Sequence, residues 1–390
     1  MRLKINRSIL LAGLMALATS ACGGNGAVPS NTGAAAARAA SANAAPADTT
    51  SILKLLTKNV TIGSTVDPAN GDQGPRAISV VQSSSGKLKK NQVLVCNFED
   101  SSGNAGNGTT IEQLAPVTSS KPATFIQNSK IEGCDGDAVT GADADDVFAT
   151  GMTSKAMVEI NSKGKLKKSF GSPITEPIGD GAAPPLYDYS PEIMFIGNAD
   201  TGAVDNIGVG YNGNNKLLEV INGFPVNKGS GWSALGPSGL SYWCGVPKGS
   251  YTCGNKADVL YIADGACNAV VAISHASTLL IKDEITIEPG CKKFSCKYRT
   301  DTCATLVKAG SPLDNPVAMT LLPNGNLIVA NTGNNMLVEM TPKGKVLDTL
   351  VVDTGQAPAV FGLAAIGTKD SNTALFYTDT NTNTLQELEQ

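Results

Sequence analysis

The segment PVAMTLLPNGNLIVANTGNNMLVEMTPKGKVLDTLV, residues 316–351, decides the fold. It contains four short apolar stretches separated by three turn sequences: PNG at 323–325, TGNN at 332–335 and PKG at 342–344. Asn and Gly tolerate positive φ and Pro presets φ, so each sequence favours a tight turn. The second stretch, residues 327–330, is apolar on both faces, which predicts a strand covered on both sides. A four-stranded meander of this kind is typical of one blade of a β-propeller.

Segments similar to the second stretch recur along the chain. The set is QVLVCNF (92–98), DDVFATG (145–151), EIMFIGN (192–198), DVLYIAD (258–264), NLIVANT (326–332) and ALFYTDT (374–380). Propeller repeats usually span about 40–50 residues, and two insertions, 230–256 and 287–303, lengthen two of the intervals. We therefore predict an all-β, six-bladed propeller with these segments as inner strands. A β-sandwich with similar hairpins is the alternative, and the even spacing of the six segments argues against it.

The later strands repeat as well, and the last repeat lacks a strand. MVEINSKGKLKKSF (157–170) aligns with LVEMTPKGKVLDTL (337–350), including the central Lys-Gly-Lys. The final repeat, from Phe361, has three candidate strands, FGLAAI, ALFYTD and TLQELE, before the chain stops at Gln390. Because an open edge strand invites aggregation, we predict that the segment within residues 51–63 adds the fourth strand to the last blade.

The repeat resembles the NHL family of β-propellers. The residues that carry the resemblance are Asn315-Pro316, the 323–325 turn, Leu-Ile-Val-Ala-Asn at 327–331, Gly-Asn-Asn at 333–335 and Leu-Val-Glu at 337–339. The match is good in this blade, fair near residues 263–264 and 378–379, and poor in the first three blades. The resemblance implies a fold and leaves the function open, because propellers host many functions.

The N-terminus predicts export. Residues 1–7 are basic, residues 9–18 are an apolar run too short to span a bilayer, and small residues precede Cys22. This arrangement resembles a bacterial lipoprotein signal, which implies lipidation of Cys22. Thr19 departs from that pattern, which usually has Leu there, so simple cleavage with an unmodified Cys22 stays open. Gly23 follows Cys22 where lipoproteins retained in the inner membrane have Asp, so we expect the outer membrane.

The domain organisation follows from composition. Residues 1–21 are expected to be the signal peptide, 22–50 an Ala/Gly/Ser-rich disordered tether, and 51–390 the propeller. Removal of the signal takes away three cations and changes the formal net charge from −4 to −7. A mildly acidic chain without a basic stripe disfavours nucleic acid as a partner. We expect a monomer held to the membrane through lipid on Cys22, with an unknown protein or glycan partner.

Cysteine usage supports an exported chain. Eight of the nine cysteines remain when Cys22 is set aside, an even number suited to disulfides. Sequence cannot fix the connectivity, but local pairing suggests the set Cys244–Cys253, Cys296–Cys303, Cys96–Cys134 and Cys267–Cys291. The competing interpretation is a zinc knuckle at Cys291, Cys296 and Cys303. It lacks a CxxC spacing and a nearby histidine.

Candidate chemistry is sparse. His275 is the only histidine, which excludes a site with several histidine ligands, and no GxSxG elbow accompanies it. Acidic and amide residues follow the predicted inner strands, where they favour turns by bonding their own backbone. Their functional interpretation is a Ca²⁺ site of oxygen ligands. It resembles the gluconolactonase-like propellers, which hold a divalent cation in the channel. That resemblance implies a candidate set of Glu192, Asn198, Asp264 and Asp379.

Two further groups of residues were considered. The acidic run CDGDAVTGADADD (134–146) lacks the EF-hand order, so a solvated loop is expected, with weak Ca²⁺ binding as the alternative. The aromatic residues of the 230–256 insertion suit stacking on a sugar ring or anchoring a partner, or else a small core under the loop. They are Trp232, Tyr242, Trp243 and Tyr251.

The sequence therefore predicts a lipid-anchored, exported NHL-like propeller that acts as a binding or protein-interaction module of the bacterial envelope. We expect no cofactor other than a possible Ca²⁺. The first alternative is a divalent-metal-dependent hydrolase of the gluconolactonase-like kind. The second is a purely structural envelope protein. No catalytic residue is assigned.

Overall fold

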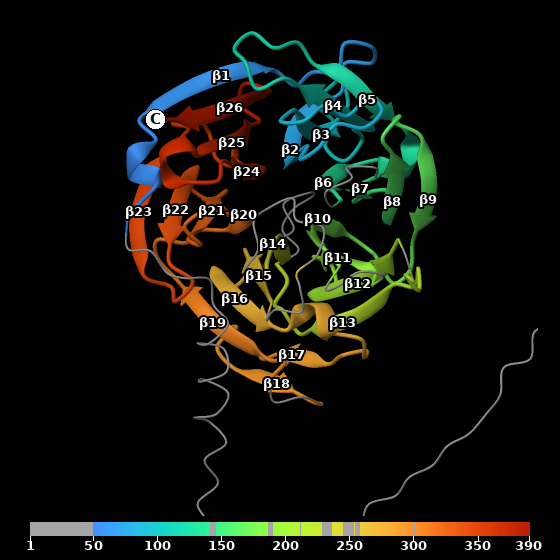
Figure 1. Cartoon of the computed structure of the whole chain (residues 1–390), viewed down its shortest axis with the longest axis vertical. Coiled ribbons are helices and arrows are strands. Elements are labelled where there is room, and N and C mark those ends of the chain that lie inside the picture. Colours follow the sequence, from blue (N-terminus) through green and yellow to red (C-terminus); the bar gives the residue numbers. More distant parts are fainter. Residues whose placement is uncertain are drawn as a thin grey trace, which may run out of the picture.

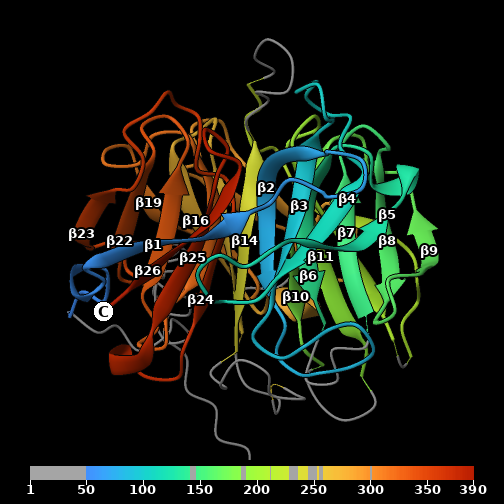
Figure 2. The same cartoon turned by 90° about the horizontal axis from the view of Figure 1, so that it is seen from above.

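The computed structural model of the protein describes residues 50–140, 146–185, 190–210, 212–227, 236–244, 253, 258–298 and 301–390. Their strands form six sheets arranged radially around a central axis, as the face-on view shows (Figure 1). Turned by 90°, the same disc shows the strands running across its thickness (Figure 2). The predicted six-bladed β-propeller is therefore confirmed. No helix in this part of the chain is long and apolar enough to cross a membrane.

The blades are numbered in chain order, and their strands are given from the axis outward. Blade 1 comprises β2 (Gln73–Val80), β3 (Val93–Glu99), β4 (Thr110–Leu114) and β5 (Ala123–Gln127); blade 2 comprises β6 (Cys134–Val139), β7 (Asp146–Gly151), β8 (Ala156–Asn161) and β9 (Leu166–Phe170). Blade 3 comprises β10 (Pro177–Ala183), β11 (Glu192–Asn198), β12 (Ala203–Val209) and β13 (Leu218–Asn222); blade 4 comprises β14 (Pro237–Trp243), β15 (Val259–Asp264), β16 (Ala269–Ser274) and β19 (Ala304–Ala309).

The remaining blades include the stretch that predicted the fold. Blade 5 comprises β20 (Pro316–Leu321), β21 (Leu327–Asn331), β22 (Met336–Met340) and β23 (Val346–Val351); blade 6 comprises β24 (Leu363–Ile366), β25 (Ala374–Asp379), β26 (Thr384–Glu389) and β1 (Lys58–Ser64). Four short 3₁₀ helices lie in the described part of the chain: η1 (Leu53–Leu55), η2 (Ser129–Ile131), η3 (Ala276–Thr278) and η4 (Asp370–Asn372). Residues 316–351 form the four strands expected of them.

The six repeated apolar segments are the second strands of their blades, so each is an interior strand of its sheet, as predicted. The strands nearest the axis are β2, β6, β10, β14, β20 and β24. A second strand has a neighbour on each edge and a blade on each face, so most of its residues are apolar; β21 is buried at every residue. A first strand borders the channel with one edge and carries smaller and more polar residues.

The two insertions also need a correction. Residues 230–256 were expected to be a loop, but Pro237–Trp243 within them is β14, the first strand of blade 4. The second insertion lies between β16 and β19 and builds β17 (Ile285–Ile287) and β18 (Phe294–Cys296). Both strands extend blade 3 outward, because Ile221 of β13 pairs with Ile285 of β17 in parallel.

The N-terminal segment closes the ring as predicted. β1 pairs antiparallel with β26, from Lys58 opposite Glu389 to Ser64 opposite Thr384, and lies on the outer edge of blade 6 (Figure 1). The residues just before β1 reach blade 5, where the buried Glu339 carboxylate accepts hydrogen bonds from the N–H groups of Ile52 and Leu53, at 3.2 and 2.8 Å. The segment therefore joins blades 5 and 6.

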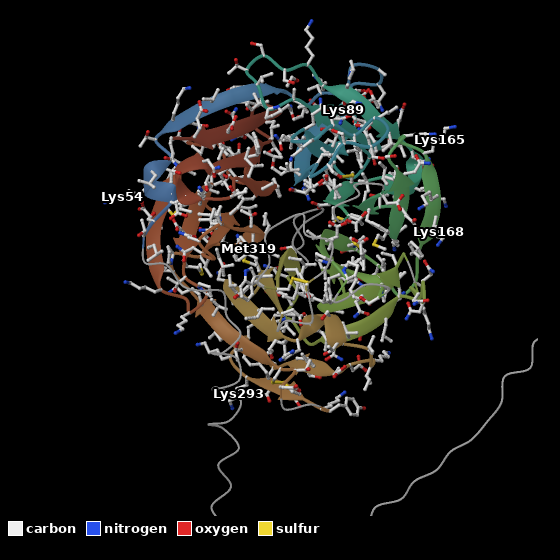
Figure 3. The ribbon with its side chains drawn as sticks, viewed as in Figure 1. Lys54, Lys89, Lys165, Lys168, Lys293 and Met319 are labelled. Carbon is white, nitrogen blue, oxygen red and sulfur yellow. A yellow bond between two sulfur atoms is a disulfide. The ribbon has the colours of Figure 1, made fainter. Side chains whose placement is uncertain are left out.

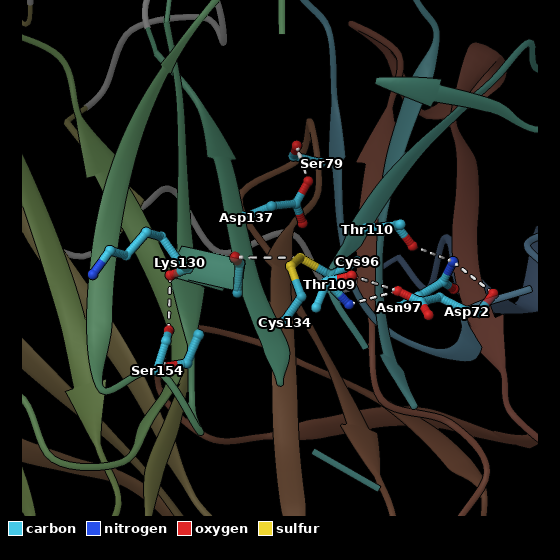
Figure 4. Close-up of a disulfide and its surroundings, with 12 residues drawn as sticks. Asp72, Ser79, Cys96, Asn97, Thr109, Thr110, Lys130, Cys134, Asp137 and Ser154 are labelled. Carbon is cyan, nitrogen blue, oxygen red and sulfur yellow. Dashed lines mark hydrogen bonds between the residues drawn. A yellow bond between two sulfur atoms is a disulfide. The ribbon is translucent and has the colours of Figure 1, made fainter. Parts of the chain in front are cut away.

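Four disulfides join the cysteines in the pairs expected from the sequence. They are Cys96–Cys134, Cys244–Cys253, Cys267–Cys291 and Cys296–Cys303. Cys291, Cys296 and Cys303 are all used in these bonds, so the zinc-knuckle interpretation was wrong. The Cys96–Cys134 bond links β3 of blade 1 to β6 of blade 2 across their interface (Figure 4).

Candidate functional site

A channel of about 1470 Å³ runs through the propeller and is bordered by the first strands of all six blades. Side chains differ in kind between this channel and the rim of the disc. In Figure 3, Lys54, Lys165, Lys168 and Lys293 lie on the rim, whereas Met319 lies near the axis. A concave site of this size, with apolar walls and a few polar groups, is the usual form of a small-molecule site.

The first strands share a four-residue pattern that sets the shape of the channel. The pattern is Pro75-Arg76-Ala77-Ile78, Cys134-Asp135-Gly136-Asp137, Pro177-Ile178-Gly179-Asp180, Pro237-Ser238-Gly239-Leu240, Pro316-Val317-Ala318-Met319 and Val360-Phe361-Gly362-Leu363. Its third residue is Gly or Ala because neighbouring strands approach closely there. A Cβ on Gly179 would lie 2.2 Å from the Ser238 carbonyl oxygen, and one on Gly362 would lie 2.6 Å from the Arg76 carbonyl oxygen.

The fourth residue of the pattern distinguishes two blades from the others. In blades 1, 4, 5 and 6 it is apolar: Ile78, Leu240, Met319 and Leu363. In blades 2 and 3 it is Asp137 and Asp180. The register makes the six positions equivalent, since Asp180 pairs with Ile196 of the second strand as Met319 pairs with Val329. Two adjacent blades thus bring carboxylates where the fold elsewhere uses an apolar side chain.

These two carboxylates lack the partners that buried charges normally have. Both oxygens of Asp180 and Oδ1 of Asp137 are buried and accept no hydrogen bond. Only Oδ2 of Asp137 has a donor, the Ser79 hydroxyl at 2.5 Å (Figure 4). Burial raises the pKa of Asp137 to about 7. It raises the pKa of Asp180 well above the usual range, and the nearby charge of Asp137 adds to that rise.

Two cations of the described residues, Arg76 and Lys90, line the same channel; Lys90 is exposed, and Arg76 is already paired. The guanidinium of Arg76 donates to Oδ2 of Asp135 at 2.9 Å and lies over the ring of Phe98, 3.5 Å from its centroid, and over that of Phe361, at 4.4 Å. Burial raises the pKa of Asp135 to about 6 even though Arg76 lowers it. Because the Arg76 guanidinium is ion-paired with Asp135, it does not balance the charge of Asp137 and Asp180.

Apolar and aromatic side chains of blades 4 and 5 line the same channel. Leu240, Met319, Tyr242 and Trp243 all line it. From the sequence, Tyr242 and Trp243 were expected in a long loop. That expectation was wrong, because both residues belong to β14. Tyr242 stacks on Phe195 with 6.3 Å between ring centroids, and Trp243 packs against the core between blades 4 and 5. Trp232 and Tyr251 lie outside the described residues. The two aromatic residues that are described therefore serve both the core and the channel wall.

The metal ligands expected from the sequence lie at the ends of second strands in different blades. Oδ1 of Asn198 accepts from the Glu176 N–H at 3.1 Å, that of Asp264 from the Cys267 N–H at 2.7 Å, and that of Asp379 from the Asn381 N–H at 2.9 Å. Each of these three side chains therefore accepts hydrogen bonds from the turn in which it lies or from the loop that leads into its blade. Burial raises the pKa of Asp264 to about 7, and its Oδ2 has no partner. Glu192 begins β11, at the opposite end of that strand from Asn198.

The acidic run at 134–146 is only partly what was expected. Asp135 and Asp137 were expected in a solvated loop, but they belong to β6 and are 6 and 7% exposed. Residues 141–145 lie outside the described part of the chain. A signal for β6 was present in the sequence, because Asp-Gly-Asp at 135–137 repeats the spacing of Ile-Gly-Asp at 178–180. His275, the single histidine, follows β16 in a turn with φ +52°, as predicted.

No family model matches the sequence, and no curated protein matches it. Solved structures with a similar fold include a virginiamycin B lyase from Staphylococcus aureus in complex with quinupristin, at TM-score 0.46 and 15% identity, with 85% of each chain covered. A streptogramin B lyase has TM-score 0.46 and 13% identity, with 85% of this chain and 96% of that chain covered. A putative gluconolactonase has TM-score 0.49 and 10% identity, with 82% and 90% covered. Likeness at this level says nothing about activity.

Proposed function

We propose that this chain is a binding protein of the bacterial envelope and that its channel binds a small organic molecule carrying a protonated amine. The single observation that carries the proposal is the pair Asp137 and Asp180. Two adjacent blades place carboxylates at a position where the other four place Ile, Leu or Met, and three of the four carboxylate oxygens have no donor. A buried charge without a partner is costly to the fold, and a binding role accounts for its presence in the channel.

The dimensions of the channel favour an organic ligand over a bare ion. A volume of about 1470 Å³ exceeds what one ion fills, and sites for small organic ligands commonly have volumes of about 300–1,000 Å³. The wall formed by Leu240, Met319, Tyr242 and Trp243 suits an apolar or aromatic body. An ammonium group would meet the two carboxylates in a setting of low dielectric constant, where such contacts are stronger than in water.

Calorimetric titration tests this function. We would titrate the full mature chain with 2-phenylethylamine, cyclohexylamine and the neutral analogue 2-phenylethanol, and repeat the series on Asp180→Asn. The expected result is one site per chain for an amine, with binding of 2-phenylethanol at least about tenfold weaker because the charge contact is absent. Asp301→Asn, at an exposed carboxylate, is the matched control and should bind normally. Equal binding of the neutral analogue, or no binding of any amine, would refute the proposal.

A divalent-metal-dependent hydrolase is the second candidate, because carboxylate oxygens from two neighbouring strands are also the ligands that hard cations prefer. In that case Asp137 and Asp180 would hold the ion, in place of the set around Asp264 and Asp379. Titration with Ca²⁺, Mg²⁺ and Zn²⁺ discriminates the two candidates. A site abolished by Asp180→Asn, together with metal-dependent hydrolysis of a lactone or ester, would favour the enzyme.

The envelope address rests on the N-terminal sequence. The signal-like residues 1–21, Cys22 and the Ala/Gly/Ser-rich stretch to residue 50 support a lipid anchor with a tether long enough to keep the disc clear of the bilayer. The four disulfides suit an oxidising compartment. Metabolic labelling with a fatty-acid analogue tests this part. The wild type should take up the label and sediment with outer membranes. The Cys22→Ser variant should take up no label and should not sediment with them. Labelling of the Cys22→Ser variant would disprove an anchor at that position.

A further inference from the structure

The two faces of the disc carry different charged residues. The strands of each blade alternate in direction, so the connections from first to second strand and from third to fourth strand lie at one face. The connections from second to third strand and those between blades lie at the other face. We call the first of these the lysine face. It is defined by the exposed side chains of Lys87, Lys89, Lys163, Lys165, Lys343 and Lys345.

The lysines of blades 1 and 2 lie in two connections that touch each other. The sequence GKLKK occurs at 86–90, between β2 and β3, and again at 164–168, where the turn after β8 leads into β9. The Lys87 N–H donates to the Ser162 carbonyl at 2.7 Å and holds the two connections together. Lys89 and Lys165 extend from these neighbouring blades in Figure 3. The fold thus gathers two lysine-rich segments that are far apart in sequence.

Carboxylates do not balance the charge of these lysines. The Lys87 ammonium donates to the Phe125 carbonyl and the Lys89 ammonium to the Gly86 carbonyl, each at 3.3 Å, and both acceptors are uncharged. Among the ion pairs of the described residues, none includes a lysine of residues 87–89 or 163–165. Lys167 differs, because it is ion-paired with Asp146 and Glu159.

The sequence of the connections at this face has a positive balance. Residues 81–92, 140–145 and 162–165 together hold five lysines and two aspartates, a formal charge of +3. Residues 341–345 of blade 5 add two lysines and no acidic residue. The opposite face has several partly exposed carboxylates in its connections: Asp100, Glu132, Glu176, Asp314 and Asp353. In a chain of negative net charge, the lysine face is therefore a local exception.

The chain enters the propeller at the lysine face. β1 begins at Lys58 opposite Glu389, the last residue of β26, which is a third strand and ends at that face. In Figure 2 the start of β1 lies beside the C-terminus. The Thr50 carbonyl accepts from the side-chain amides of Asn324 and Asn326, at 3.4 and 3.3 Å, in the connection between the first two strands of blade 5.

The segment that precedes Thr50 is not suited to cover the lysines. Residues 22–49 contain one cation and one anion, Arg38 and Asp48, so the segment has no net charge with which to neutralise a basic surface. Its composition is that of a tether. A tether holds the disc near the bilayer and by itself leaves the orientation of the disc open.

We propose that the lysine face docks on a membrane surface rich in anionic phospholipid. Ammonium groups suit phosphate oxygens because each offers three donors and a compact charge. A lysine close to an anionic membrane surface contributes roughly a factor of five in affinity, so several lysines together set an orientation. The argument that this face is turned to the bilayer rests on the lipid anchor at Cys22 proposed above, because the chain between Cys22 and the disc arrives at this face.

Cosedimentation with vesicles tests the surface without the anchor. The probe protein is the full mature chain with Cys22→Ser, so no attached lipid contributes. The vesicles are pure phosphatidylcholine or phosphatidylcholine with phosphatidylglycerol. We expect binding only to vesicles with phosphatidylglycerol at about 0.1 M NaCl, and a loss of most of it at about 0.5 M NaCl, because salt screens the contact.

Two variants with equal changes in charge locate the surface. Replacing Lys87, Lys89, Lys163 and Lys165 by Gln should weaken binding at least about tenfold. Replacing four exposed lysines of the opposite face by Gln is the matched control and should leave binding unchanged; they are Lys130, Lys155, Lys292 and Lys293. Both variants should keep the parent Tm. Asp180→Asn should bind vesicles like the parent, which separates the lysine face from the channel.

Four results would overturn the proposal. They are equal binding to pure phosphatidylcholine, no binding to phosphatidylglycerol at low salt, equal loss in the two lysine variants, and release from the vesicles by millimolar inorganic phosphate. The last would assign the lysines to a free anion. If Cys22 takes up no lipid label while the vesicle results are as expected, the anchor is refuted and the docking surface is supported.

Discussion

Blades 3 and 5 present the same first strand to the channel with opposite chemistry. In both, Pro begins the strand, a small residue allows the neighbouring strand to approach, and the next residue pairs with an apolar residue of the second strand. That next residue is Met319 in blade 5 and Asp180 in blade 3. Blade 5 has the residue that packing requires. Blade 3 has one that weakens packing, and Asp137 of blade 2 repeats it. The difference separates what the ring needs in order to fold from what the channel needs in order to bind.

The comparison assumes that the six blades form one closed ring, and breaking the ring gives the largest expected effect. Deletion of residues 51–63 removes β1 and the contacts of Ile52 and Leu53 with blade 5. It leaves β26 with an open edge and Glu339 buried without donors. We expect cooperative unfolding to be lost or the Tm to fall by more than about 15 °C. Circular dichroism during heating measures this. Deletion of residues 24–45 is the control, and an equal loss there would contradict the closure.

Exchanging the chemistry of the two blades gives the next largest effect. Met319→Asp places an unpaired carboxylate in an apolar contact and should cost about 3–5 kcal/mol of unfolding free energy. Asp180→Met removes one and should gain about 1–3 kcal/mol while abolishing amine binding. Urea denaturation measures both. If Asp180→Met destabilises the protein, Asp180 has a structural role and the comparison fails.

The pH dependence of stability tests whether the buried Asp137 carboxyl has the raised pKa that its surroundings impose. Because burial raises the pKa of Asp137 to about 7, the folded state binds more protons than the unfolded state above the usual carboxyl range. The stabilising contribution is therefore fully present below about pH 4 and is lost as pH rises toward 7. Burial also raises the pKa of Asp205 and of Asp264 to about 7, and both groups add to the same pH dependence. We expect the Tm without ligand to fall over this pH range. In Asp137→Asn the fall should be smaller by about 2–4 °C. A saturating amine should also reduce the fall in the wild type.

The apolar wall gives the smallest expected effect. Trp243 lines the channel and also packs against the core between blades 4 and 5. Trp243→Ala should weaken the binding of 2-phenylethylamine about tenfold and lower the Tm by a few degrees, whereas Trp243→Phe should restore most of both. Calorimetric titration and thermal unfolding measure the two effects. Unchanged affinity in Trp243→Ala would show that the organic body of the ligand does not contact Trp243.

The sequence predicted the parts of the fold that depend on long apolar stretches. The second strands and the turns of residues 316–351 were recognisable because packing on both faces requires apolar residues and tight turns require Asn, Gly or Pro. The closing strand was predicted because the last repeat was one strand short. The first strands of blades 2 and 4 were not recognised, because their edge on the channel relaxes the apolar pattern. Cys134–Val139 therefore looked like an acidic loop, and Pro237–Trp243 looked like part of an insertion.

The candidate site was missed for the same physical reason. Asp137 was noticed as part of an acidic run, but its partner Asp180 is 43 residues further along and was not considered. Only the ring of blades brings the two together. Asn198, Asp264 and Asp379 attracted attention because acidic and amide residues gather at strand ends. In the structure their side chains bond the turns in which they lie, and whether they hold a metal stays a prediction. The aligned Gly-Asp pairs at 136–137 and 179–180 were the usable signal.

The most direct measurement is a crystal structure of the mature chain in complex with 2-phenylethylamine. We predict density for the ammonium group within hydrogen-bond distance of both Asp137 and Asp180, with the ring of the ligand against Leu240, Met319 or Trp243. An amine bound elsewhere, with the two carboxylates still unpaired in the channel, would contradict the account.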